Sequence, residues 1–168
     1  VLARAHQADR ATIDAAVKAA VEAQRDWAHW RFEDRAAVFL RAAELLATTH
    51  RQLLNAATML GQSKTAYQAE IDSACELIDF LRFNVHYADR IYQEQPQSAP
   101  GVWNRLDHRP LEGFVYAITP FNFPAMIPLW FMPYAVAAGN CFILKPSEKV
   151  PMTTAKMFEL IEKCGFPA

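Results

Sequence analysis

Residues 113–148 read GFVYAITPFNFPAMIPLWFMPYAVAAGNCFILKPSE, and no charged residue or histidine occurs in this stretch before Lys145. Four prolines interrupt the apolar run. Because proline removes a backbone donor and clashes with the preceding helical turn, an unbroken membrane-spanning helix is not expected. We instead predict a strand, a tight loop, a buried helix and a second strand, a unit that is apolar throughout when its sheet is covered on both faces. Lys145 and Glu148 then emerge at the edge where open α/β sheets bind ligands.

The boundaries of this unit follow from its turn residues. We predict strands over Gly113–Ile118 and Cys141–Lys145, with a helix from about Ala125 to Ala138 between them. Gly139 comes after that helix, where a residue with left-handed backbone commonly ends a helix. A further helix is expected from about Thr153 to Cys164. Two parallel strands have unpaired edges, so we expect an incomplete sheet whose next strand would lie beyond the end of the chain.

Upstream, residues 9–93 have the apolar spacing of helices. Asp9 or Thr12 can cap a first helix and Asp34 a second, and a third is expected to stop at Gly61. The apolar positions of these three helices are Ile13, Val17, Val21 and Trp27; Val38, Phe39, Ala42, Leu45 and Leu46; and Leu53, Leu54, Ala57 and Leu60. One face of each helix must therefore bury against another element.

A long fourth helix is expected to start at Thr65, because Thr65 and Gln68 have the spacing of a capping box. Its apolar stripe reads Ile71, Cys75, Ile78, Leu81, Val85, Ala88 and Tyr92. This pattern predicts that Cys75 is buried. Pro and Gly then break the helical pattern, so residues 96–110 are interpreted as a connector, with a short strand expected over Val102–Asp107.

The composition is that of a folded protein in a reducing compartment. Hydrophobic residues make up 52% of the 168 residues and charged residues 21%. Lys plus Arg number 17 and Asp plus Glu 18, so attraction to nucleic acid or to an anionic membrane is not expected. The three cysteines are far apart and odd in number, which argues against a disulfide framework, and the five histidines lack metal-ligand spacing. The chain begins at Val1 without an initiator Met or a signal-peptide pattern, which indicates processing or truncation.

Polar residues follow both predicted strands. Parallel strands joined by a helical crossover end at the same edge of their sheet, so Asn122 should lie on the same side as Lys145 and Glu148. The amide of Asn122 would suit an oxyanion, and the ammonium and carboxylate of Lys145 and Glu148 would suit a diol such as a ribose. The alternative is that Asn122 caps the helix or holds the loop and that Lys145 and Glu148 are solvated turn residues. The spacing alone favours this alternative, because such residues are common in turns.

The motifs around these residues resemble the aldehyde dehydrogenase superfamily. The segments that carry the resemblance are Phe114–Pro124, Gly139-Asn140 and Lys145–Glu148. The resemblance implies that Asn122 helps to hold a thioester oxyanion and that NAD is the cofactor. The residues that it implies for NAD are Thr119, Pro120 and Phe121 beside the nicotinamide half, and Lys145 and Glu148 at the adenosine ribose, in a segment with Pro146 and Ser147. Trp130, together with Ile127, would border the substrate tunnel; the alternative for Trp130 is a buried helix aromatic.

Further upstream the resemblance narrows. Residues 1–6, 34–36, 61–65, 68–72 and 76–84 resemble one branch, the mitochondrial pyrroline-5-carboxylate dehydrogenases, which oxidise glutamate semialdehyde to glutamate in proline degradation. Residues 124–130 and 146–151 resemble methylmalonate-semialdehyde dehydrogenase, a branch that passes the acyl group to CoA. The substrate is therefore open between two aldehydes. A non-catalytic interaction module that keeps the fold is a third alternative.

The resemblance implies an α/β fold in three parts. These are a helical region over residues 1–95, a connector over 96–110 and, over 111–168, the first β-α-β-α part of an incomplete Rossmann-like NAD-binding domain. The family's nucleophilic cysteine, general-base glutamate and Gly-rich turn are expected beyond the end of the chain, so the chain alone should be inactive. Cys75 is interpreted as a core residue, and neither Cys141 nor Cys164 has a basic neighbour that would plainly lower its pKa. For the complete enzyme, the resemblance implies a homo-oligomer in the mitochondrial matrix.

Overall fold

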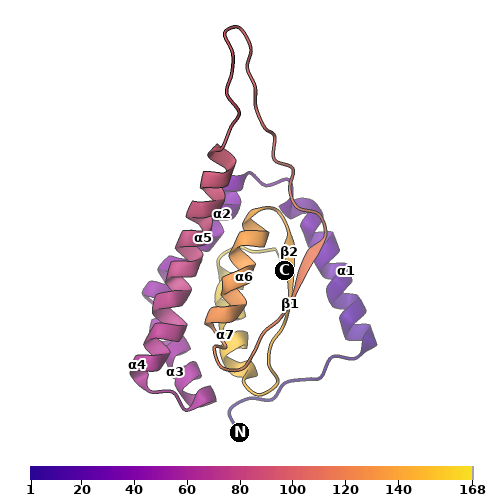
Figure 1. The fold of residues 1–168 in the computed structure, drawn as a ribbon. Helices are drawn as coiled ribbons and strands as arrows, with labels where there is room; N and C mark the ends of the chain where they lie inside the picture. Colours follow the sequence, from indigo (N-terminus) through magenta and orange to yellow (C-terminus); the bar gives the residue numbers. More distant parts are fainter. Residues whose placement is uncertain (168) are drawn as a thin grey trace.

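The computed structural model describes residues 1–167; Ala168, the last residue of the expected NAD-binding part, lies outside them. The elements, in chain order, are α1 (Arg10–Trp27), α2 (Phe32–Ala47), α3 (Arg51–Gln62), α4 (Ala66–Glu70), the π-helical segment η1 (Ile71–Cys75), α5 (Glu76–Gln93), β1 (Phe114–Ile118), α6 (Met126–Ala137), β2 (Cys141–Lys145) and α7 (Pro151–Lys163) (Figure 1). The α/β fold class expected from the sequence is confirmed.

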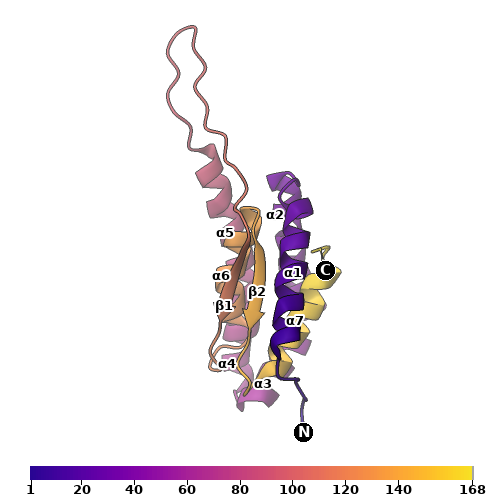
Figure 2. The ribbon, with the colours of Figure 1, turned by 90° about the vertical axis from the view of Figure 1, so that its right-hand side faces the viewer.

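The sheet is a parallel pair. β1 and β2 run in register from Phe114 opposite Cys141 to Ile118 opposite Lys145, and α6 is the crossover between them. Both strands therefore end at one edge. α6 lies on one side of the sheet and α1 along the other (Figure 2). β2 has the predicted bounds, and β1 begins one residue later than predicted because Gly113, with a φ of 70°, belongs to the turn before it.

The β1-α6-β2 unit is fastened to the helical region. α2 and α5 pack against α6, and α1 packs against β2. The fully buried side chains of the shared core include Phe39, Leu81, Leu129 and Met157. At the C-terminal end of α6, Trp27 Nε1 donates to the carbonyl of Val136 at 2.8 Å and Arg35 Nε to that of Ala137 at 2.9 Å. These donors satisfy carbonyls that lack partners within the helix, and Arg35 places a positive charge at the negative end of the helix dipole.

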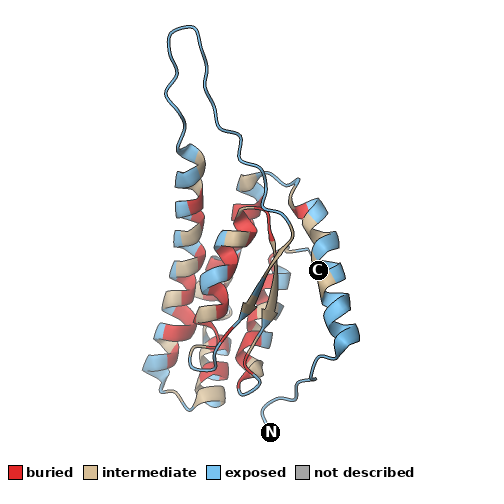
Figure 3. Ribbon diagram, turned by 45° about the vertical axis from the view of Figure 1, so that its right-hand side comes forward, coloured by how far each residue is buried: buried red, intermediate tan, exposed pale blue. Residues whose placement is uncertain are grey.

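The first helix buries less of its apolar stripe than predicted. Ile13 and Val21 are exposed, and Trp27 is the buried residue of α1 (Figure 3). The face of α1 toward the sheet is built from alanines instead. Ala16, Ala19, Ala20 and Ala23 line a cavity of about 680 Å³ together with residues of β2 and α7. The small side chains bring α1 near the sheet without filling the space between them.

Two helix boundaries differ from the predictions. α2 begins at Phe32, so Asp34 lies in its first turn and does not cap it; the N-cap position is Arg31, which makes no side-chain capping bond. The charge of Asp34 still favours that end of the helix through the dipole. α3 continues past Gly61 to Gln62, because Ser63 and not Gly61 takes the left-handed conformation, at a φ of 54°.

Residues 94–113 contain no helix or strand, so the strand predicted over Val102–Asp107 is wrong (Figure 1). This segment projects from the rest of the chain as a long loop. Polar side chains rather than a backbone ladder hold its two arms: Gln95 Oε1 accepts from the amide of Leu106 at 2.8 Å, and Ser98 Oγ accepts from that of Asn104 at 3.0 Å.

The capping box at Thr65 is confirmed, since Thr65 Oγ1 accepts from the Gln68 amide and Gln68 Oε1 from the Thr65 amide. The continuous helix expected after it is interrupted by η1. The prediction that Ile71 and Cys75 are buried is wrong, because both are exposed. A π turn holds one extra residue, which rotates the residues before it relative to those after it. Ala69, Asp72 and Ser73 are buried in their place, whereas the stripe from Ile78 through Leu81 and Val85 to Ala88 is buried as predicted.

Candidate functional site

The predicted site residues lie on two loops that leave the same edge of the sheet. The amide of Thr119, directly after β1, donates to the carbonyl of Lys145 at the end of β2 at 3.1 Å. Residues 119–125 and 146–150 therefore begin side by side. The loops approach again further out, where Lys149 Nζ lies 4.6 Å from the ring centroid of Phe121. The topology thus brings Asn122, Lys145 and Glu148 to one edge.

Lys145 and Glu148 present a donor and an acceptor together. Lys145 Nζ lies 3.2 Å from Glu148 Oε2, and both side chains are exposed. The backbone N–H of Glu148, and after it the Lys145 ammonium, lowers the pKa of the Glu148 carboxyl. Ser147 is buried, and its Oγ accepts from the amide of Lys149 at 3.3 Å, which fixes the turn. A charged pair on a fixed turn is able to bind two neighbouring hydroxyl groups.

This turn forms part of the wall of a large cavity. The cavity has a volume of about 1380 Å³, and Lys145, Pro146, Ser147 and Glu148 are among its lining residues, together with Tyr116, Ile143 and the N-terminal segment. Thr119, Pro120 and Phe121 are not among them. The structure therefore groups the four residues expected at the ribose, and it places the residues expected at the nicotinamide on the adjacent loop.

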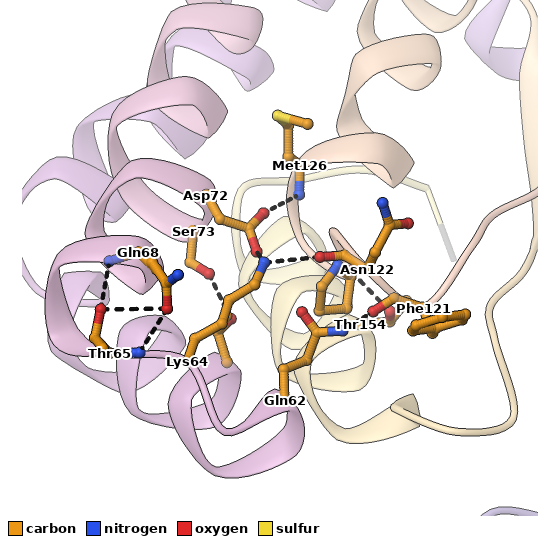
Figure 4. Close-up of polar contacts among 12 residues, drawn as sticks. Gln62, Lys64, Thr65, Gln68, Asp72, Ser73, Phe121, Asn122, Met126 and Thr154 are labelled. Carbon is orange, nitrogen blue, oxygen red and sulfur yellow. Dashed lines mark hydrogen bonds and ion pairs between the residues drawn. The ribbon is translucent and has the colours of Figure 1, made fainter.

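Thr119 is buried, whereas Pro120 and Phe121 are exposed. The carbonyl of Phe121 accepts a hydrogen bond from Gln62 Nε2, at the end of α3 (Figure 4). The main chain of this loop is thus held from the helical region.

Asn122 has a fixed main chain and an exposed side chain. Its carbonyl oxygen accepts from Lys64 Nζ at 2.7 Å. Within residues 1–167 its side-chain amide makes no hydrogen bond, and Figure 4 shows that amide turned away from Lys64. The alternative that Asn122 caps the following helix is wrong, because the N-cap position of α6 is Ala125 and the first free amide, of Met126, donates to Asp72 Oδ1 at 3.4 Å. The amide of Asn122 is available to a ligand.

An ion pair between a partly buried lysine and a buried aspartate lies directly behind this loop. Lys64 Nζ is 2.7 Å from Asp72 Oδ2, and the side chains are 16% and 1% exposed. Lys64 Nζ also lies 4.4 Å from the ring centroid of Phe123. Burial raises the pKa of Asp72, and its hydrogen bond and attraction to Lys64 oppose that shift. Neither residue could be assigned a role from the sequence. Lys64 lies in a segment that resembles the family but has no chemistry of its own to mark it, and a regular helix would turn Asp72 outward.

Trp130 is 49% exposed and stacks on Phe80 of α5 with ring centroids 5.3 Å apart. The alternative of a buried helix aromatic is therefore wrong for Trp130. Ile127 is partly buried and packs against the core. Whether these two residues border a substrate tunnel stays a prediction.

Neither Cys141 nor Cys164 has the features of a reactive thiol, because burial raises the pKa of both. Cys75 is exposed, and its Sγ lies 3.7 Å from a guanidinium nitrogen of Arg51. Across residues 1–167 no cluster of three or more His, Cys, Asp or Glu side chains could hold a metal ion. In the same residues no helix is both long and apolar enough to cross a membrane.

Residues 1–168 match the aldehyde dehydrogenase family. The probable delta-1-pyrroline-5-carboxylate dehydrogenase of Schizosaccharomyces pombe is 46% identical over 170 residues, which cover 100% of this chain and 31% of that protein. The crystal structure of the pyrroline-5-carboxylate dehydrogenase from Mycobacterium tuberculosis bound with NAD is 54% identical, with a TM-score of 0.89 over 94% of this chain and 29% of that one. A methylmalonate-semialdehyde dehydrogenase structure from Oceanimonas doudoroffii is 31% identical, with a TM-score of 0.82 over 95% of this chain and 32% of that one.

Both branches that the sequence resembles are thus represented, and the pyrroline-5-carboxylate branch is the more similar. The chain spans about a third of the length of these proteins. A match over all of its residues, in agreement with the parallel strands and the loops at their common edge, is sufficient to assign a family. This chain belongs to the aldehyde dehydrogenase family.

Proposed function

We propose that this chain contributes the helical region and the first half of the cofactor domain to an NAD-dependent enzyme that oxidises glutamate semialdehyde, the open form of pyrroline-5-carboxylate, to glutamate. The observation that carries the proposal is the exposed, unbonded amide of Asn122 at the same sheet edge as the Lys145–Glu148 pair. The similarity to pyrroline-5-carboxylate dehydrogenases, at 33–54% identity, supports the choice of substrate.

The residues present fit NAD. Lys145 and Glu148 lie 3.2 Å apart on the wall of a cavity of about 1380 Å³, and this donor–acceptor pair matches the two hydroxyls of a ribose. Pro146 and Ser147 form the turn that holds the pair. We place Thr119, Pro120 and Phe121 beside the nicotinamide. Bound NAD would supply the hydride acceptor of the reaction.

Asn122 would act on the reacting carbonyl. Its amide would donate a hydrogen bond to the oxygen that becomes negative when a nucleophile adds to the aldehyde carbon. Such a donor stabilises the transition state because it is already oriented when the charge develops. The nucleophile and the general base would come from the rest of the complete enzyme, and Trp130 with Ile127 would line the approach of the aldehyde.

The proposal extends to the organisation of the complete enzyme. We assign residues 1–95 to its helical region, 96–110 to a connector and 111–168 to its cofactor domain. We expect a homo-oligomer. Relatives from Emericella nidulans and Dictyostelium discoideum are named mitochondrial, which supports a mitochondrial location, whereas the similar Mycobacterium tuberculosis enzyme is bacterial.

A second candidate is the CoA-acylating oxidation of methylmalonate semialdehyde, favoured by the match to the Oceanimonas doudoroffii structure at 31% identity. A test on the complete enzyme separates the two. NAD reduction is followed at equal concentrations of pyrroline-5-carboxylate and of methylmalonate semialdehyde, each with and without CoA. We expect kcat/KM to be higher for pyrroline-5-carboxylate and unchanged by CoA. Turnover that requires CoA would transfer the chain to the second candidate, and a folded enzyme without turnover on either aldehyde would favour the interaction module.

A further inference from the structure

We propose that the largely buried pair Lys64–Asp72 positions Asn122 by holding the main chain at the carbonyl of Asn122 and at the start of α6. This inference rests on the proposed oxyanion role of Asn122. Lys64 Nζ donates to the carbonyl of Asn122 itself, and Asp72 Oδ1 accepts from the amide of Met126 at the start of α6. The same pair is closed internally by the 2.7 Å contact between Lys64 Nζ and Asp72 Oδ2. Lys64 and Asp72 therefore join two points of the loop, four residues apart, into one rigid unit (Figure 4).

Two further contacts restrain the same loop. Gln62 Nε2 donates to the carbonyl of Phe121, and Thr154 Oγ1 of α7 donates to that of Pro124 at 3.0 Å. Residues 121–126 are thus fastened to three separate elements. Gln62 holds the peptide group before Asn122, and Lys64 holds the one after it through the carbonyl of Asn122 itself. The bond from Lys64 differs in that its donor belongs to the ion pair with Asp72.

The π-helical segment is what brings Asp72 to this place. Asp72 is the second residue of η1 and is 1% exposed, whereas Ile71 beside it is 37% exposed. In a regular α-helix one residue corresponds to about 100° of rotation, so removal of the extra residue would turn Asp72 away from α6. π turns of this kind occur frequently at functional sites. The helix is therefore irregular at the point where the carboxylate of Asp72 reaches the loop that carries Asn122.

The carboxylate also supplies a cap that α6 lacks. Its N-cap residue, Ala125, has no side chain that could accept a hydrogen bond, and no acidic residue occurs in its first turn. Asp72 provides the negative charge and the acceptor from another element. The ion pair that holds the carbonyl of Asn122 therefore also caps the start of α6.

Stability alone does not explain why a charged pair is used. Taking two charges out of water costs free energy, and replacement of a buried ion pair by apolar residues of similar volume is often neutral for stability or stabilising. If the pair only stabilised the fold, an apolar pair in its place should leave both folding and kcat intact. If the pair positions Asn122, an apolar pair should lower kcat, because apolar side chains cannot hold the carbonyl of Asn122 or the amide of Met126.

The test uses the complete enzyme with pyrroline-5-carboxylate and NAD. Lys64→Met/Asp72→Leu removes both charges and leaves neither unpaired, and we expect it to fold. Its kcat should fall by about 10²-fold, the effect of displacing a catalytic group by about 1 Å, with little change in KM for NAD. Lys64→Arg keeps a charged donor and should recover most of the lost kcat. Arg35→Met is the matched control: it removes a buried cation from the other end of α6 and should lower Tm without lowering kcat comparably.

A double-mutant comparison separates positioning from general loosening. If the pair acts through Asn122, then adding Lys64→Met/Asp72→Leu to Asn122→Ala should lower kcat little further, because the amide that the pair orients is already absent. Independent, additive losses, or a folded apolar-pair enzyme with full kcat, would overturn the inference. Absence of turnover in the unsubstituted enzyme would refute the proposed function instead, and the two failures are therefore distinguishable.

Discussion

The carbonyl and the side-chain amide of Asn122 have separate surroundings. Lys64 holds the carbonyl from the buried side of the loop, and the amide is exposed on the other side. Lys145 and Glu148 have the opposite arrangement, since their side chains bond to each other and both remain accessible. The two halves of the proposed site are thus built differently: one has a restrained main chain, the other a paired set of charges.

The different construction predicts different kinetic effects. Asn122→Ala should lower kcat by roughly 10²–10³-fold, the usual effect of losing an oxyanion donor, and leave KM for NAD nearly unchanged. The measurement is steady-state NAD reduction by the complete enzyme. The kcat of Asn122→Ser, which keeps a shorter donor, should lie between that of Asn122→Ala and that of the unsubstituted enzyme. An Asn122→Ala enzyme with full kcat and a raised KM for NAD would show that Asn122 binds cofactor.

For Lys145→Ala we expect weaker NAD binding with a smaller effect on the chemical step, because a ribose contact is remote from the reacting carbon. The change also removes one of the groups that lower the pKa of Glu148. Binding is measured by titration calorimetry and the chemical step by single-turnover kinetics. Lys156→Ala on α7 is a suitable control, since Lys156 is likewise exposed and paired with a glutamate three residues away. Equal losses in Lys145→Ala and Lys156→Ala would remove Lys145 from the site.

The sequence predicts the position of a site residue where the topology of the sheet determines that position. Parallel strands force Asn122 and Lys145 to one edge, and this required no knowledge of side-chain contacts. The partners of those residues depend on tertiary contacts. Nothing in the local pattern indicates that Lys64 reaches a carbonyl 58 residues further along the chain.

Among the elements, α6 is set by its ends more than by its own pattern. Its side chains are apolar nearly all round, so periodicity gives it no preferred face. Asp72 caps its start, and its other end closes in a Schellman motif, with the amide of Asn140 bonded to the carbonyl of Ala135 and that of Gly139 to Val136. The Gly139-Asn140 signal predicted this end from sequence. By contrast, the π-helical segment η1 could not be predicted from the sequence, because an extra residue in one turn leaves no signature in the spacing of apolar residues.

The C-terminal turn of α6 provides a stability prediction. Gly139 has a φ of 100°, and an added Cβ would lie 2.6 Å from Cβ of Pro110. Gly165 has nearly the same φ, 103°, but within residues 1–167 no atom beyond its chain neighbours lies within 4 Å of an added Cβ. Gly165→Ala should therefore cost about 1 kcal/mol for left-handed backbone alone. Gly139→Ala should cost clearly more, since the clash adds to the strain. Equal midpoints in urea unfolding of the complete enzyme would show that the chain around Pro110 yields freely.

On the scale of the whole molecule, apolar surface is unevenly distributed. Tyr116 and Ile118 of β1 are 55% and 69% exposed, and Trp130 and Phe131 of α6 are 49% and 53% exposed. Within residues 1–167 the sheet consists of β1 and β2 alone, so each strand has an edge without a partner. In a larger parallel sheet such strands would be covered on both faces. Several apolar side chains of residues 113–144 therefore remain exposed within residues 1–167.

This excess predicts how the 168-residue chain behaves by itself. Exposed strand edges and exposed large apolar side chains favour association between copies, so we expect the isolated chain to oligomerise or aggregate and to bind a hydrophobic dye strongly. Sedimentation velocity and dye fluorescence, measured across a dilution series, test this directly. Ile118→Lys/Phe131→Lys should reduce both signals, because it places charges on the exposed apolar surface without touching a buried side chain. A monomeric chain with a cooperative thermal transition and no dye binding would mean that residues 1–168 close their own core, and the interaction module would then become the better account of the isolated chain.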